Sequence, residues 1–172
     1  MTADERAGPD TITDFMAEDH RRLDAFFQSF AGDLLSTGPG RYDEFRAELL
    51  RHIGMEEKIL IPAVQQANGG RPLSVAARLR TDHGALAALL MLPPKPAIIA
   101  MIQAILNEHN ELEERQGGAY ALCDELLAGD TSILTRLRAS PLPAVAPPSD
   151  HPNVYHAARR VIMRAGYTWK DE

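Results

Sequence analysis

Apolar residues recur at helical spacing in four long segments of this chain, and stretches rich in glycine and proline separate the segments. Long helices joined by short loops pack as antiparallel neighbours. The pattern therefore predicts an all-α protein, an up-down-up-down antiparallel four-helix bundle with a C-terminal extension. The predicted helices cover about residues 11–35, 43–67, 74–91 and 96–116.

Two features interrupt the regular pattern. Pro62 lacks the N–H that a helix interior requires, so we expect a kink in the second helix there. Glycines at 117–118 weaken the end of the fourth helix, and helical spacing resumes at Tyr120 and Leu127. This predicts either a bend or a fifth helix.

The two ends of the chain differ from the bundle. Residues 1–10 are mostly polar and are expected to be disordered, whereas residues 11–138 are expected to form the bundle. A proline-rich stretch follows Arg138. Residues 139–172 are therefore expected to hold a linker and one short helix at about 155–164.

Composition limits the class of protein. The 172 residues are enough for one domain with a sizeable core. The formal net charge of −6 argues against nucleic-acid binding, and the single cysteine, Cys123, excludes an internal disulfide. No apolar run approaches the roughly 18 residues of a membrane span, and the polar N-terminus is unlike a secretory signal. These features predict a cytoplasmic protein that binds neither nucleic acid nor membrane.

Polar residues lie on the apolar stripes, where the core is expected. Each predicted helix carries one histidine on its stripe, and two of these histidines have a glutamate four residues later, on the same helix face. Burial of a carboxylate without a partner lowers the stability of the fold by several kcal/mol. A shared counter-charge is therefore needed, and metal ions supply it most simply. The residues concerned are His20, His52, Glu56, His83, His109 and Glu113.

The two halves of the chain repeat this arrangement. A DHxxL segment at 19–23 recurs at 82–86, and an HxxxEE segment at 52–57 recurs at 109–114. The repeat predicts two metal ions, each with two histidines, and two carboxylates that can bridge them. Imidazole and carboxylate suit iron, manganese or zinc and disfavour copper(I). Bridging carboxylates favour a redox-active di-iron centre, although two close metals can also catalyse hydrolysis.

These four segments resemble the motifs of hemerythrin-like domains, the HHE cation-binding family, over roughly residues 12–128. The resemblance implies two iron ions held by the six histidines and glutamates above, with Glu56 and Glu113 as the bridges. The motifs are DHRRL at 19–23, HIGMEE at 52–57, DHGAL at 82–86 and HNELEE at 109–114.

The resemblance also suggests functions. Oxygen-carrying hemerythrins have a fifth histidine where this chain has Ala87, which implies an open metal position and disfavours simple oxygen carriage. The favoured function is binding or sensing of O₂, NO or peroxide, or of iron itself. The first alternative is a di-iron enzyme of the peroxidase, catalase or oxidase kind; the second is an iron-handling protein with labile metal. A ferritin-like site is disfavoured because its E-x-x-H spacing is absent.

Other polar residues receive simpler interpretations. Four acidic residues near the motifs are expected to be solvated or to orient a histidine. Tyr120 could approach the site, but a core aromatic is the simpler interpretation, and Cys123 is expected to be a small buried residue. His151 and His156 are expected at the surface. The four acidic residues are Asp19, Glu57, Asp82 and Glu114.

Overall fold

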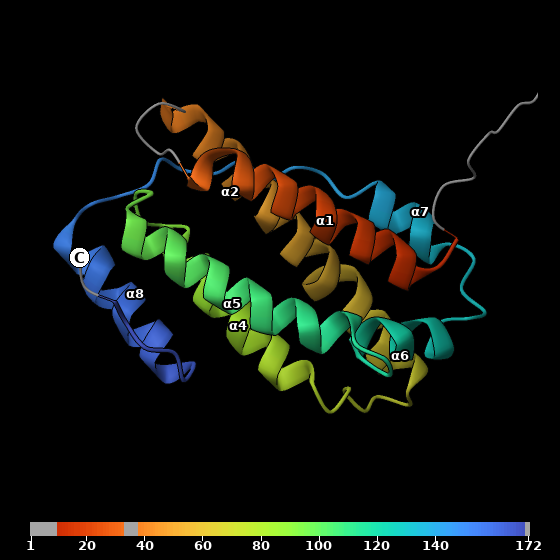
Figure 1. The fold of residues 1–172 in the computed structure, drawn as a ribbon. Helices are drawn as coiled ribbons and strands as arrows, with labels where there is room; N and C mark the ends of the chain where they lie inside the picture. Colours follow the sequence, from red (N-terminus) through yellow and green to blue (C-terminus); the bar gives the residue numbers. More distant parts are fainter. Residues whose placement is uncertain (1–9, 33–37, 171–172) are drawn as a thin grey trace, which may run out of the picture.

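The computed structural model describes residues 10–32 and 38–170, and every regular element in these ranges is helical. Four long rods of helix lie side by side, and shorter helices lie near their ends (Figure 1). The predicted all-α bundle is therefore confirmed. The rods are α1 (Ile12–Ala31), α2 (Gly38–Met55) continued by the π-helix η1 (Glu56–Leu60) and α3 (Ile61–Ala67), α4 (Ala76–Leu89) and α5 (Pro96–Glu114). The short helices are α6 (Ala119–Leu126), α7 (Ile133–Arg138) and α8 (Pro152–Arg164).

Most predicted boundaries agree with the structure to within a few residues, but α2 begins five residues earlier than expected, and α7 was not predicted. The predicted disordered start and Leu34, at the end of the first stripe, lie outside the described residues except for Asp10. No helix in the described ranges combines the length and hydrophobicity that a membrane crossing requires.

The helix ladder changes at η1, one turn before Pro62. Proline cannot donate a backbone hydrogen bond, and the N–H of Ile61 donates to the carbonyl of Glu56, five residues back. The ladder thus changes through a π turn, whereas the kink expected at Pro62 stays a prediction. Such turns often occur at functional sites, and this one begins at a glutamate that points into the core.

The start of α1 is fixed by α6. The Thr11 side chain accepts the N–H of Asp14 at 3.0 Å, as expected of an N-cap. Asp124 of α6 accepts the N–H groups of Ile12 and Thr13 at 2.7 and 3.1 Å and the Thr13 hydroxyl at 2.6 Å. The first N–H groups of a helix have no partner within the helix. Here Asp124 accepts two of them and the Thr11 cap accepts a third.

The buried apolar residues form two separate clusters along the bundle. On α1, Phe27 and Phe30 belong to the larger cluster, whereas Ile12 and Met16 belong to the smaller one. His20 lies between these two sets on the same helix. A layer of polar residues therefore interrupts the core near the middle of the bundle.

The chain after α7 runs back along the bundle to α8 at the opposite end (Figure 1). Three backbone contacts hold this segment: Arg51 donates to the carbonyl of Ser140 at 2.8 Å, Arg46 donates to that of Ala146 at 2.9 Å, and the N–H of Ser149 donates to the Met91 carbonyl at 2.8 Å. The helix α8 then packs against α4. The described part of the C-terminal extension thus contacts the bundle both in the segment before α8 and through α8 itself.

Candidate metal centre

Six polar side chains from all four rods converge in the polar layer. Each is at most 5% exposed, so each must find its partners inside the protein. These are the six residues that the sequence pattern singled out: His20, His52, Glu56, His83, His109 and Glu113.

The first half of the layer joins α1 to α2. The Nε2 atoms of His20 and His52 lie 2.9 Å apart. Glu113 Oε2 lies 3.4 Å from His20 Nε2, and Glu56 Oε1 lies 3.6 Å from His52 Nε2. These four residues offer ligand atoms within 4.8 Å of one another, close enough to share one metal ion.

The second half joins α4 to α5 and mirrors the first. The Nε2 atoms of His83 and His109 lie 3.1 Å apart. Glu56 Oε2 lies 3.0 Å from His83 Nε2, and Glu113 Oε1 lies 3.2 Å from His109 Nε2. Each glutamate therefore directs one oxygen toward each histidine pair, so the two groups overlap at both carboxylates.

A carboxylate faces the outer nitrogen, Nδ1, of every one of these histidines. Glu114 bonds to His20, Asp19 bonds to His52 at 2.8 Å, and Glu57 bonds to His83 at 2.7 Å. Asp82 lies 3.5 Å from His109 Nδ1. An acceptor at Nδ1 keeps the proton there and leaves the Nε2 lone pair free, as in metal-bound histidine. Three of the four acidic residues are thus placed to orient a histidine through a hydrogen bond. Asp82 lies near His109, but the buried Nδ1 of His109 has no hydrogen-bond partner among the described residues.

This arrangement fits a bound cation. With protons on Nδ1, the Nε2 lone pairs of each histidine pair would face each other at hydrogen-bonding distance without a proton between them. Glu56 Oε2 is also fully buried and has no hydrogen-bond partner among the described residues. Metal ions between the paired nitrogens and the glutamates would satisfy all of these atoms together.

Without metal, protons take the place of cations. Burial lowers the pKa of His20, but hydrogen bonds to Glu113 and Glu114 outweigh it and raise the pKa to about 9. Burial likewise opposes protonation of His109, whereas the nearby carboxylates of Asp82 and Glu113 raise its pKa to about 10. Burial raises the pKa of Glu113, but His109 and His20 hold it well below its usual range. Metal binding must therefore displace protons from this site.

Tyr120 belongs to the smaller apolar cluster, as expected of a core aromatic, and its hydroxyl also reaches the polar layer. Its hydroxyl lies 2.5 Å from Glu56 Oε1, 3.0 Å from Glu113 Oε2 and 3.1 Å from His20 Nε2. Burial and the adjacent carboxylates raise its pKa well above the usual range, so it is a phenol and a hydrogen-bond donor.

A tight turn returns the chain to the site. Gly117 has a φ of 70°, and a Cβ at Gly118 would lie 2.6 Å from the carbonyl oxygen of Glu113. Glycine is therefore required at 118 by close backbone approach, and at 117 it relieves a left-handed conformation. The glycine pair in the sequence was the available signal for the placement of Tyr120.

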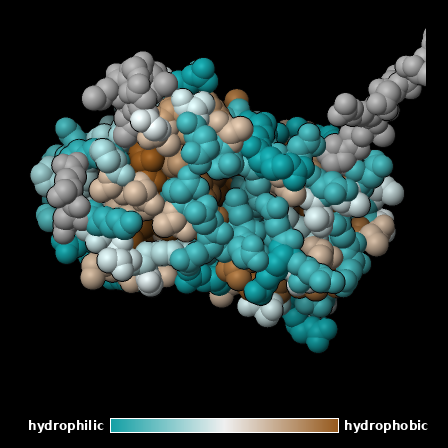
Figure 2. All heavy atoms as spheres, viewed as in Figure 1, coloured by the Kyte–Doolittle hydropathy of each residue, from teal (hydrophilic) through white to brown (hydrophobic). Residues whose placement is uncertain are grey.

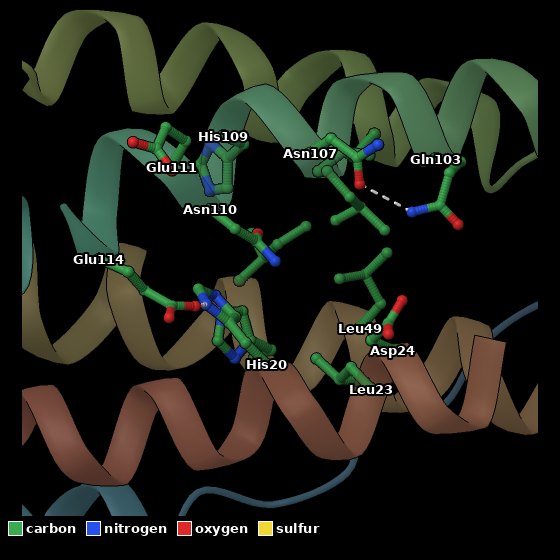
Figure 3. A pocket seen from close by; sticks show the side chains of 14 residues that line it. His20, Leu23, Asp24, Leu49, Gln103, Asn107, His109, Asn110, Glu111 and Glu114 are labelled. Carbon is green, nitrogen blue, oxygen red and sulfur yellow. Dashed lines mark hydrogen bonds and ion pairs between the residues drawn. The ribbon is translucent and has the colours of Figure 1, made fainter. Parts of the chain in front are cut away.

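A cavity of about 320 Å³ reaches the layer from the surface between α1 and α5. His20, His52 and His109 form part of its lining. The side chain of Asn110 projects from α5 toward His20 (Figure 3), and its Oδ1 is buried without a hydrogen-bond partner among the described residues. The face of the molecule that carries α1 and α5 is largely hydrophilic (Figure 2).

The remaining candidates lie away from this layer or on its edge. His151 and His156 are exposed, as expected, and His151 caps α8 by accepting the N–H of Asn153. Cys123 is buried, and burial raises the pKa of its thiol to about 12. Ala87, at the position of the fifth histidine in oxygen carriers, is partly buried. Neither group of candidate ligands in the described ranges includes a fifth histidine.

Antiparallel helices around two overlapping groups of buried histidine and glutamate define a helical-bundle protein built to bind cations. The hemerythrin HHE cation binding domain matches residues 11–116, and the chain belongs to this family. No curated protein and no solved structure matches the chain. The matched segment includes all six converging residues but ends before Tyr120.

Proposed function

We propose that the chain is a non-haem di-iron protein that binds or senses a small ligand such as O₂, NO or peroxide. Six residues would hold the metals, with Glu56 and Glu113 as bridges between the two ions. The overlap of the two groups at both carboxylates carries this proposal, because each glutamate offers separate oxygens to separate histidine pairs. The other four ligands would be His20, His52, His83 and His109.

The donor set supports iron. Histidine and carboxylate together bind iron, manganese or zinc, and each group here would give one metal two nitrogens and two oxygens. Bound iron would supply one-electron redox chemistry and affinity for small diatomic ligands and peroxide. The protein would orient the histidines through their outer carboxylates and keep the site enclosed.

The cavity supports a small external ligand. It leads from the surface to three of the four histidines, so a ligand can reach the metals without unfolding the bundle. Non-haem iron sites built from two histidines and one carboxylate keep open positions for external ligands, and each group here has a similar donor set. Binding and sensing are both consistent with this geometry.

An enzyme of the peroxidase or catalase kind is the second candidate, and Tyr120 is the observation that favours it. A neutral phenol beside the glutamates and His20 can donate a hydrogen bond, or a proton, to a reacting ligand. Steady turnover of peroxide would support this function. A sensor would instead change conformation or partner binding with its redox state.

The decisive measurement is metal content after anaerobic loading with iron, with optical spectra before and after exposure to air. We expect about two irons per chain and new charge-transfer bands on oxidation. His52→Ala, which removes one of the six candidate ligands, should bind less iron. His156→Ala is the matched control, because His156 is exposed. One iron per chain, or zinc retained in preference to iron, would contradict the di-iron proposal.

A further inference from the structure

The C-terminal extension reaches the metal centre through Tyr167, which lies outside the segment matched by the family. The Tyr167 hydroxyl donates to Asp82 Oδ1 at 2.9 Å. Arg78 in turn donates to the Tyr167 hydroxyl at 2.7 Å, and its Nε lies 3.1 Å from the Asp82 carboxylate. Asp82 itself is fully buried, and its other oxygen faces His109 Nδ1.

The corresponding contact in the first half of the bundle lacks this arrangement. Asp19 lies 2.8 Å from His52 Nδ1, in the position that Asp82 occupies relative to His109. Its other partner is Arg22, three residues along the same helix. No tyrosine donates to Asp19 in the hydrogen bonds of the described residues. The two halves therefore repeat in their inner residues but differ in what fixes the outer carboxylate.

We propose that Tyr167 is a positioning residue that makes the two metal positions unequal, acting through Asp82 on His109. The inference rests on the proposed dimetal function. It assigns to the extension an effect on the affinity of the metal position formed by His83 and His109. The affinity of the position formed by His20 and His52 is expected to stay unchanged.

The physical reason is competition for one carboxylate. Arg78 Nε donates to Asp82 Oδ2 at 3.1 Å and lies equally close to Oδ1, while Oδ2 lies 3.5 Å from His109 Nδ1. The Tyr167 hydroxyl donates to Oδ1 and so helps to fix the rotation of the carboxylate. Without that hydroxyl, Arg78 alone fixes this rotation, and Oδ2 is less firmly held toward the imidazole. An outer partner of a metal-bound histidine typically changes metal affinity by about 10–100-fold.

Tyr167→Phe tests this inference with little other disturbance. The ring would remain under the Arg78 guanidinium, which lies 5.0 Å from its centroid, so that only the hydroxyl is lost. Tyr155→Phe is the matched control. Tyr155 belongs to the same extension, and its buried hydroxyl has no hydrogen-bond partner among the described residues.

Each protein would be titrated anaerobically with Co²⁺ alone, by calorimetry and by its visible spectrum. We expect two Co²⁺ per chain in the unmodified protein and in Tyr155→Phe. In Tyr167→Phe, one of the two should bind about tenfold more weakly, with an altered spectrum, while the other is unchanged. Asp19→Asn should weaken the opposite position, which assigns the two steps.

The outcomes separate this inference from the proposed function. Two equal losses in Tyr167→Phe, or no loss, would overturn the positioning role while two bound metals in the unmodified protein still support the metal centre. Failure of the unmodified protein to bind two metals would overturn both. A purely structural role would lower the unfolding temperature of metal-free Tyr167→Phe without changing the ratio of the two affinities.

Discussion

The Tyr120 hydroxyl lies 2.5 Å from Glu56 Oε1, and this contact closes the polar layer on the side of α6. Because Tyr120 is fully buried, Phe at this position would leave a buried carboxylate without its donor. We expect Tyr120→Phe to lower the free energy of unfolding of the metal-free protein by about 2 kcal/mol, the typical worth of a hydrogen bond to a charged group. Urea denaturation would measure the loss.

The iron content of Tyr120→Phe, unlike its stability, should not change. Since none of the six candidate ligands changes, Tyr120→Phe should still bind about two irons per chain. Equal unfolding free energies of the variant and the unmodified protein would show that the hydroxyl contributes nothing in the absence of metal. A fall to one iron would instead make Tyr120 a ligand.

Removal of a shared ligand should differ from removal of an unshared one. Glu56 contributes an oxygen to each histidine pair, whereas His52 belongs to one pair only. We expect Glu56→Ala to lose affinity for both metals and His52→Ala to retain one. Elemental analysis after dialysis would count the metals.

Thermal unfolding of the same two variants gives an independent measure. Bound metal stabilises the native state by about 4 kcal/mol when its free concentration is a thousandfold above Kd. Addition of iron should therefore raise the unfolding temperature of the unmodified protein most, that of His52→Ala less, and that of Glu56→Ala least. Equal shifts in all three would remove these residues from the metal site.

Asn110 should influence which ligands reach the centre. Its buried Oδ1 is an acceptor that a peroxide can donate to and O₂ cannot. We expect Asn110→Leu to slow oxidation of the ferrous protein by peroxide about fivefold, the effect of one neutral hydrogen bond of roughly 1 kcal/mol. Oxidation by O₂ should change little. Stopped-flow spectroscopy would compare the two oxidants.

Asn107→Leu is the control for that measurement. Asn107 also lines the cavity, but it is exposed and its Oδ1 already accepts from Gln103 at 2.9 Å. Similar slowing in both variants would point to blocked access and against hydrogen bonding as the cause.

Asp124 should contribute to stability without contributing to metal binding. It accepts three hydrogen bonds from the first turn of α1, which carries a partial positive charge. We expect Asp124→Ala to lower the free energy of unfolding by about 2–3 kcal/mol. Iron content at 25 °C should be maintained. Loss of iron with unchanged helical content would show that the contact between α6 and α1 also affects the metal site.

The convergence of the six inner residues was predictable because it depends on local geometry. A histidine on an apolar stripe must face the core, and residues four apart share a face, so His52 and Glu56 point inward together. The outer contacts depend on distances across the fold. Tyr120 follows a glycine turn that ends helical periodicity, and Tyr167 meets Asp82 across 85 residues of sequence. No spacing rule relates Tyr167 to Asp82.

The helix boundaries show the same limit. The missing N–H of Pro62 predicts a change at that residue, whereas the hydrogen-bond ladder adjusts in the preceding turn, at Glu56–Leu60. The helix α7 has only six residues, fewer than two turns, and its periodicity is too short to distinguish from a loop.

The polar layer divides the core into two apolar clusters, and this division bears on how the bundle folds. Hydrophobic contact is continuous within each cluster, but between them it gives way to charged and hydrogen-bonded groups. In such an arrangement, the presence or absence of metal in the polar layer determines whether the two ends of the bundle unfold as one cooperative unit or as two. Metal loading would then set the folding cooperativity of the domain as well as its chemistry.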